Sequence, residues 1–179
     1  MYQFSKTIVL FFSLCTALLL LTMCQAIASE QLEKTPDLIL LEDMQKEAAL
    51  TSKLCVPLVV MVSQFSCMHC EKLREKVLLP LLKSGEFDGK AQFRELLIDS
   101  DELVTDINGN TATGMQLAKR YIENVLTPTM LIIDPSGNEV AKRIVGISNI
   151  DFYSLYFEAE INAAYLKMSK MCLQNAGEK

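Results

Sequence analysis

Two cysteines separated by two residues, Cys67 and Cys70, are the part of the sequence best suited to chemistry. They follow the apolar run Val59 to Val62 and the more polar segment 63–66, and a helical pattern begins directly after them. A Cys-x-x-Cys pair at the start of a helix can close and reopen a disulfide with little movement. Free N–H groups and the positive end of the helix dipole favour a thiolate on the first cysteine. The pair therefore predicts thiol–disulfide exchange.

The elements before the pair must hold it at a fixed corner. Residues 58–63 are apolar at nearly every position, which is typical of a central strand covered on both faces. A helix is expected before this strand. It should begin at Thr35-Pro36-Asp37, because proline is favoured at the first helical position, and fade near Ser52. Its apolar stripe consists of Leu38, Leu41, Met44 and Ala48.

The helix after the pair should carry a core-facing stripe at four-residue spacing. That stripe consists of Leu73, Val77 and Leu81. Pro80 cannot donate to the helical ladder, so it should kink or end the helix, and Ser84-Gly85 is a stop. A polar loop over 85–92 then leads to a second apolar strand, Phe93 to Ile98.

A short hairpin is expected next. Asn108-Gly109, within Leu103 to Thr111, is the strongest short hairpin signal, and the hairpin could be a substrate-facing flap or a plain surface loop. Thr113 and Gln116 fit a capping box, which predicts a helix that continues to Tyr121.

The remaining chain predicts a second hairpin. Thr127-Pro128 stands directly before a strand over Met130 to Ile133. A tight turn over 135–138 leads to a returning strand, Glu139 to Val145, and Gly146 breaks the pattern.

A long amphipathic helix should close the chain. Ser148 and Asp151 have the spacing of a helix cap, which places the helix over Asn149 to Met171. One apolar stripe consists of Phe152, Leu155, Ala159 and Ala163, and beside it lie Phe157, Ile161, Ala164 and Met168. Strands joined by helices, followed by a hairpin and a helix, predict a mixed sheet with helices on both faces.

The N-terminus predicts export. Lys6 precedes the uncharged apolar run Thr7 to Cys24, and Ala26-Ile27-Ala28 is a cleavage pattern, so we expect a signal peptide removed after Ala28. An uncleaved membrane anchor is the alternative, and a membrane contact is expected only in that case. Removing residues 1–28 takes away only Lys6, which changes the net charge from −5 to −6. No basic cluster is present, which argues against a nucleic-acid partner.

The order of elements resembles the thioredoxin superfamily, given Cys67-Met68-His69-Cys70 after the first strand and Thr127-Pro128 before the third. The chain is most similar to small exported thioredoxin-like proteins of the SoxW type and to the C-terminal thioredoxin domain of DsbD. The resemblance implies an α/β thioredoxin fold: a mixed central sheet of about four to five strands flanked by helices, with an N-terminal helix and a small hairpin insertion. The expected division is a signal peptide (1–28), a lead-in (29–36), a thioredoxin-like domain (37–172) and a C-terminal tail (173–179).

The resemblance also implies roles for individual residues. Cys67 would be the exposed nucleophile and Cys70 the resolving cysteine. Pro128 would be a cis-proline facing them, and Thr127 would lend its backbone to a bound substrate strand. An ordinary trans proline that opens an edge strand is the alternative for Pro128.

Three departures from the family pattern bear on the chemistry. Ser66 replaces a tryptophan that many members carry beside the first cysteine. Met61 stands where thioredoxin carries a buried acid that moves the proton of the second cysteine, so another group or water must serve, with Glu71 as a candidate. Met68-His69 replaces Gly-Pro, and His69 at the helix tip is expected to stabilise the Cys67 thiolate, which makes the disulfide a better oxidant.

Cys55 and Cys172 remain after the predicted cleavage. In an oxidising compartment they could form a second disulfide that pins the last helix, or they could be inert thiols. A zinc site is disfavoured because the chain has one histidine and no second Cys-x-x-Cys. Copper(I) held by the dithiol near Met61, Met68 and Met130 is an alternative, although methionines are more simply core residues.

The sequence thus predicts a periplasmic or otherwise exported thiol–disulfide oxidoreductase. Its clients would be disulfide-containing exported proteins, and a membrane donor of the DsbD type could keep it reduced. We expect no cofactor beyond the redox-active disulfide Cys67–Cys70, and no metal. The alternatives are a dithiol oxidase or isomerase of the DsbA or DsbC type, a copper(I)-handling chaperone, and a binding module without redox chemistry.

Overall fold

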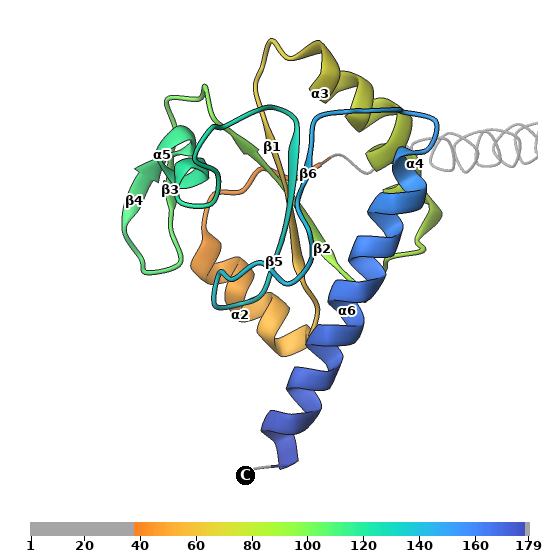
Figure 1. The fold of residues 1–179 in the computed structure, drawn as a ribbon. Coiled ribbons are helices and arrows are strands. Elements are labelled where there is room, and N and C mark those ends of the chain that lie inside the picture. Colours follow the sequence, from red (N-terminus) through yellow and green to blue (C-terminus); the bar gives the residue numbers. More distant parts are fainter. Residues whose placement is uncertain (1–37, 178–179) are drawn as a thin grey trace, which may run out of the picture. The chain divides into compact units, whose positions relative to one another are not determined.

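A computed structural model describes residues 38–177, in which a four-stranded mixed sheet forms the centre (Figure 1). The strands are β1 (Leu58–Ser63), β2 (Gln92–Leu97), β5 (Thr129–Ile133) and β6 (Ile144–Val145), in the order β2-β1-β5-β6. β1 pairs with β2 in parallel and with β5 in antiparallel fashion, and β6 runs antiparallel to β5. Every residue of β1 is buried, so its prediction as a central strand is confirmed.

Helices cover both faces of the sheet, because alternate side chains of β1 point to opposite sides. Val59 and Met61 join the core beneath the helix that follows the cysteines and beneath α6 (Tyr153–Gly177). Val60 and Val62 join the second core, beneath α2 (Met44–Leu54) and α5 (Gly114–Lys119). The chain therefore has an α/β thioredoxin-like fold, as predicted.

The helix that carries the cysteine pair consists of three segments: α3 (Met68–Leu73), the π-helical turn η1 (Arg74–Leu78) and α4 (Leu79–Ser84). Its predicted inner residues are buried: Leu73, Val77 and Leu81. Pro80 does not end it. The N–H of Leu79 donates to the carbonyl of Arg74, five residues back, so the hydrogen-bond pattern changes directly before the proline. The helix stops at Gly85, whose φ is +69°.

The first helix starts later than predicted. Leu41 donates its N–H to the carbonyl of Glu95 at 2.7 Å, and Glu95 donates to the carbonyl of Ile39 at 2.9 Å, so this segment is extended along β2. Hydrogen bonds offered by the sheet edge outweigh the local helical pattern. The helix begins at Met44, where the carboxylate of Asp43 accepts two backbone N–H groups, and it ends at Leu54 rather than near Ser52.

The predicted hairpin is confirmed as β3 (Leu103–Thr105) and β4 (Thr111–Thr113). At its turn the carboxylate of Asp106 accepts the N–H groups of Asn108 and Asn110, each at 2.8 Å. The capping box is also confirmed. It starts α5, which ends at Lys119 rather than at Tyr121.

The returning strand of the second hairpin is much shorter than Glu139 to Val145. A single bridge joins Glu139 to Ile133, and regular pairing resumes only in β6. Between them, the N–H of Lys142 donates to Glu160 on α6 at 3.1 Å, and Arg143 donates to the carbonyl of Tyr121. Residues 141–143 bond away from β5, which interrupts the strand.

The last helix differs from its prediction at the start and at the end, and the structure decides which of its two apolar stripes is buried. It begins at Tyr153, after a turn in which the Asn149 side chain accepts the N–H of Asp151, and continues to Gly177. The buried stripe consists of Tyr153, Phe157, Ile161, Ala164 and Met168. The second predicted stripe therefore faces the core, and the first, which begins at Phe152 and Leu155, faces solvent. The stripe with the larger side chains packs on the sheet because it buries more apolar surface.

The predicted signal peptide and the lead-in lie outside the described residues. Among residues 38–177, no helix combines the length and apolar character needed to cross a membrane.

Candidate functional site

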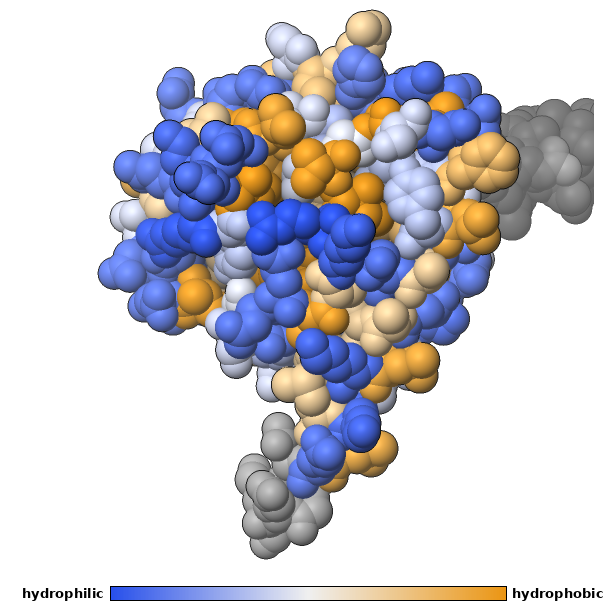
Figure 2. All heavy atoms as spheres, viewed as in Figure 1, coloured by the Kyte–Doolittle hydropathy of each residue, from blue (hydrophilic) through white to orange (hydrophobic). Residues whose placement is uncertain are grey.

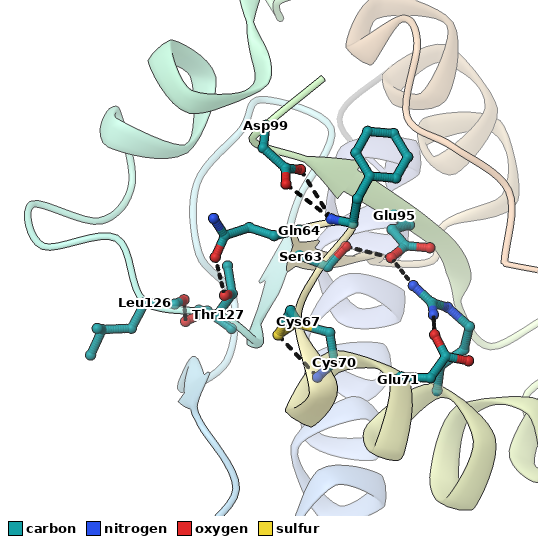
Figure 3. Close-up of a disulfide and its surroundings, with 12 residues drawn as sticks. Ser63, Gln64, Cys67, Cys70, Glu71, Glu95, Asp99, Leu126 and Thr127 are labelled. Carbon is teal, nitrogen blue, oxygen red and sulfur yellow. Dashed lines mark hydrogen bonds and ion pairs between the residues drawn. A yellow bond between two sulfur atoms is a disulfide. The ribbon is translucent and has the colours of Figure 1, made fainter. Parts of the chain in front are cut away.

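Cys67 and Cys70 are joined by a disulfide where β1 gives way to α3 (Figure 3). Their sulfur atoms lie 2.02 Å apart and their Cα atoms 5.2 Å apart. The two sulfurs differ in access, because Cys67 is partly exposed whereas Cys70 is 1% exposed and belongs to the core beneath the helix. An external disulfide can therefore reach Cys67 but not Cys70.

The backbone around Cys67 favours a negative sulfur. Cys67 is the N-cap of α3, and its Sγ accepts the N–H of Cys70 at 3.1 Å. A helix N-terminus and a donated N–H both stabilise a thiolate relative to a thiol. When the disulfide is open, this arrangement favours Cys67 as the nucleophile.

The peptide bond between Thr127 and Pro128 is cis, as the resemblance implied, which overturns the trans alternative. Its loop is tied to the loop before the cysteines, since Thr127 Oγ1 donates to Gln64 Oε1 at 2.8 Å. The carbonyl of Pro128 accepts the N–H of Gly146 at 2.8 Å. Gln64, whose role was not predicted, thus connects the two loops of the site (Figure 3).

Three exposed apolar side chains, on the segments that carry the cysteine pair and the cis peptide, make up what we call the apolar rim. Met68, in the first turn of α3, is 79% exposed, and Phe65, two residues before Cys67, is 70% exposed. Leu126 is also exposed, on the loop that contains the cis peptide. The N–H of Phe65 donates to both carboxylate oxygens of Asp99 at 3.1 Å, so an acid that follows β2 fixes this part of the rim. His69 is exposed beside Met68.

A buried ionic network, which the sequence analysis missed, lies behind the site (Figure 3). The carboxylate of Glu95 accepts hydrogen bonds from the Ser63 hydroxyl and from the guanidinium of Arg74, which also pairs with Glu71. The Glu95 side chain is only 5% exposed. Burial alone would lower the pKa of Arg74, but the hydrogen bond and charge of Glu95, followed by those of Glu71, outweigh burial and raise it.

Glu95 lies directly across from Met61 in the parallel pairing of β1 and β2. Both side chains are therefore on the sheet face that carries the cysteine helix. An acid at a position of β2 that faces the core, between the apolar residues Phe93 and Leu97, was the signal that could have found it. Glu71, the predicted candidate for proton transfer, is largely exposed and pairs with Arg74.

The second cysteine pair, left open by the sequence, forms a disulfide between Cys55 and Cys172. It ties the end of α6 to the residue that follows α2. Cys55 precedes β1 and Cys67 follows it, so the two disulfides stand at opposite ends of a strand roughly 20 Å long. At this distance the Cys55–Cys172 disulfide cannot exchange directly with Cys67.

Two hollows of the described surface lie away from Cys67. One of about 350 Å³ is lined by residues that include Leu81, Phe87 and Phe93, and another of about 530 Å³ lies beside Lys72 and Asp151. Neither is lined by the cysteine pair or the cis-proline loop.

No family model matches the chain, and the search of curated proteins finds no significant match. Among solved structures, the chain is similar to oxidised thioredoxin O2 from Arabidopsis thaliana, at 16% identity and a TM-score of 0.45, covering 69% of this chain and 94% of that one. It is similar to Fasciola hepatica thioredoxin at 18% identity and a TM-score of 0.44, covering 69% and 99%. A thioredoxin-like protein from Clostridium perfringens gives 16% identity and a TM-score of 0.42, covering 74% and 87%. The fold assignment rests on the strand order, the cis peptide and the position of the cysteine pair.

Proposed function

We propose that the chain is an exported thiol–disulfide oxidoreductase that reduces disulfides in exported partner proteins. The observation that carries this proposal is the pairing of a reachable Cys67 at a helix N-terminus with a buried Cys70, next to a cis-proline loop. Export is supported by the apolar N-terminal segment of the sequence.

The reaction proceeds in two exchange steps. The Cys67 thiolate attacks one sulfur of the client disulfide, the client S–S bond breaks, and the departing client sulfur takes up a proton. The thiolate of Cys70 then attacks Cys67, which forms the Cys67–Cys70 disulfide and releases the second client sulfur as a thiol. Two electrons pass from the dithiol to the client. A membrane donor of the DsbD type would return them, in line with the resemblance to SoxW-type proteins.

The client is expected to bind as an extended segment across the rim. No hydrogen bond to the peptide groups of Thr127 occurs within residues 38–177, which leaves them free to pair with a client backbone. Met68, Phe65 and Leu126 offer apolar contacts to side chains near the client cysteine. Backbone pairing with apolar flanks suits many sequences, which fits a general reductase.

A dithiol oxidase of the DsbA type is the second candidate, and a specific observation favours it. The N–H of Cys70 points at the Cys67 sulfur, and His69 is exposed in the same helical turn. Both would stabilise reduced Cys67 and make the disulfide a stronger oxidant. Equilibration with glutathione decides between the two: a potential near about −270 mV supports the reductase, and one near about −120 mV supports the oxidase. The variant His69→Ala should shift the potential toward the reducing end.

Trapping identifies the client. In a Cys70→Ala variant the mixed disulfide at Cys67 cannot be resolved, so exported proteins should accumulate in covalent complexes that dithiothreitol releases. Cys67→Ala is the matched control, because it retains one cysteine of the pair but removes the reachable one. Equal capture by the two variants, or no capture by Cys70→Ala, would refute the assigned order of attack.

A further inference from the structure

The outward face of α6 carries an apolar stripe that the fold does not use. Leu155, Leu166 and Leu173 of α6 are strongly exposed, at 70%, 68% and 75%, and so is Phe152 in the turn directly before the helix, at 62%. Figure 2 shows hydrophobic residues along the side of the molecule where Figure 1 draws α6. Single exposed leucines are common on protein surfaces, but a continuous row of large exposed apolar side chains indicates an interaction surface.

The spacing of the stripe is that of a coiled coil. Phe152, Ala159, Leu166 and Leu173 follow one another at intervals of seven residues, and Leu155 and Ala163 lie on the same face. A seven-residue apolar repeat keeps one seam of a helix facing a partner helix. The small residues Ala159 and Ala163, in the middle of the seam, allow two helices to approach closely.

The charges of α6 are distributed so that the helix complements itself when turned end for end. Glu158 and Glu160 lie in its first half, and Lys167 and Lys170 lie in its second half. A parallel pair would align like charges, whereas an antiparallel pair sets the acidic half of each copy against the basic half of the other. This pattern favours a second copy of the chain over an anionic membrane surface, which would repel the acidic half.

We propose that α6 forms an antiparallel two-helix seam with α6 of a second copy of this chain. With the two-fold axis between Asn162 and Ala163, Phe152 faces the partner's Leu173 and Ala159 faces the partner's Leu166. Leu155 faces the partner's Lys170, whose aliphatic stem can pack on the leucine while its ammonium group reaches water. In this register Lys167 is level with the partner's Glu158, and the partner's Glu160 is two residues away along the helix. Asn162 lies beside the axis, where a polar pair fixes the register.

Two features fix the position of α6 in the single chain. The inner side of α6 is anchored in the core by Tyr153, Phe157 and Ile161, each fully buried. Near the other end, the Cys55–Cys172 disulfide fixes the helix next to Leu173. A helix already rigid in the free chain loses little conformational freedom when it associates.

Sedimentation equilibrium of the protein purified after expression of the full sequence tests the proposal, with the N-terminus read by mass spectrometry. The dimer is expected to form as the protein concentration is raised to about 100 µM. Leu166→Glu should raise the dissociation constant of the dimer about a hundredfold, because each substitution occurs twice in a two-fold symmetric interface. Leu103→Glu, at an equally exposed leucine on β3, is the matched control and should leave dimerisation unchanged. Circular dichroism checks that both variants fold.

Carbodiimide cross-linking of mixed ¹⁴N and ¹⁵N chains tests the orientation. The antiparallel seam predicts a link from Lys167 to Glu158 or Glu160 between chains of different isotope. A monomer throughout the concentration range, a dimer that survives Leu166→Glu, or a link only between the uncleaved N-terminal segment and α6 would each overturn the proposal. The outcome is independent of redox activity, since the seam contains neither Cys67 nor Cys70.

Discussion

At the scale of single residues, the access of each sulfur decides its role. Cys67 is reachable and accepts an N–H, whereas Cys70 is enclosed by the core. The resemblance to the thioredoxin superfamily implied this difference, whereas the spacing of the cysteines alone did not. Local sequence could not reveal Glu95 as a neighbour of the site, because its partners Ser63 and Arg74 come from two other elements.

Removing the charge of Glu95 should destabilise the fold. In Glu95→Gln the guanidinium of Arg74 keeps only the exposed Glu71 as an ionic partner, so we expect a loss of about 3 kcal/mol in the free energy of unfolding. Glu71→Gln is the control and should cost less than about 1 kcal/mol, because its pair is exposed. Urea unfolding followed by circular dichroism measures both, since the chain has no tryptophan. Equal losses would show that the network is not the stabilising element.

Tyr153 carries a buried hydroxyl that finds no hydrogen-bond partner among the described residues. Tyr153→Phe should therefore keep or raise stability, by up to about 1 kcal/mol, whereas the neighbouring Tyr156→Phe should change little. Burial, followed by the nearby Tyr156, raises the pKa of Tyr153.

The raised pKa also sets a pH dependence. The unfolded chain releases the Tyr153 proton from about pH 10 upward while the folded chain retains it, so the wild type should lose stability above that pH more steeply than Tyr153→Phe. Urea unfolding between neutral and alkaline pH measures the difference. A clear loss of stability in Tyr153→Phe at neutral pH would contradict the unpaired hydroxyl.

At the scale of elements, prediction succeeded where the signal is local. β1, the inner face of the cysteine helix, the capping box at Thr113 and the Asn108-Gly109 hairpin all follow from patterns within a few residues. Prediction failed where residues distant in the sequence determine the local structure. The segment before Met44 is extended because β2 offers hydrogen bonds to it, and α6 turns its larger stripe inward because the sheet selects that face.

The turn between β3 and β4 should respond to acid. The Arg120 side chain, followed by the N–H groups of Asn110 and Asn108, lowers the pKa of Asp106 from 3.8 to about 2. A lowered folded-state pKa adds stability above the unfolded value, and this stability is lost as the pH falls from about 4 to 2. Asp106→Asn should therefore be less stable than wild type at neutral pH, and the difference should shrink over that window.

Urea unfolding from pH 2 to pH 7 measures this effect, with the exposed Asp101→Asn as control. A difference between wild type and Asp106→Asn that stays constant down to pH 2 would contradict the role given to the Asp106 carboxylate.

At the scale of the whole molecule, the sheet separates three functions in space. One end of β1 carries the Cys67–Cys70 disulfide, at which we propose exchange, and the other end carries the disulfide that fixes α6. The outward face of α6 is left for a second copy. The resemblance of the sequence to thioredoxins predicted the first of these regions. It could not predict the third, because the choice between the two stripes of α6 depends on the assembled core.

The most direct measurement is the reduction of insulin disulfides by dithiothreitol in the presence of catalytic amounts of the protein. Wild type should accelerate the reaction, and so should the double variant Cys55→Ser/Cys172→Ser, whose altered disulfide lies far from the site. Cys67→Ser should reduce the rate to that of dithiothreitol alone, because no reachable thiolate remains. Acceleration that survives Cys67→Ser would contradict the account, and so would wild-type protein that gives none.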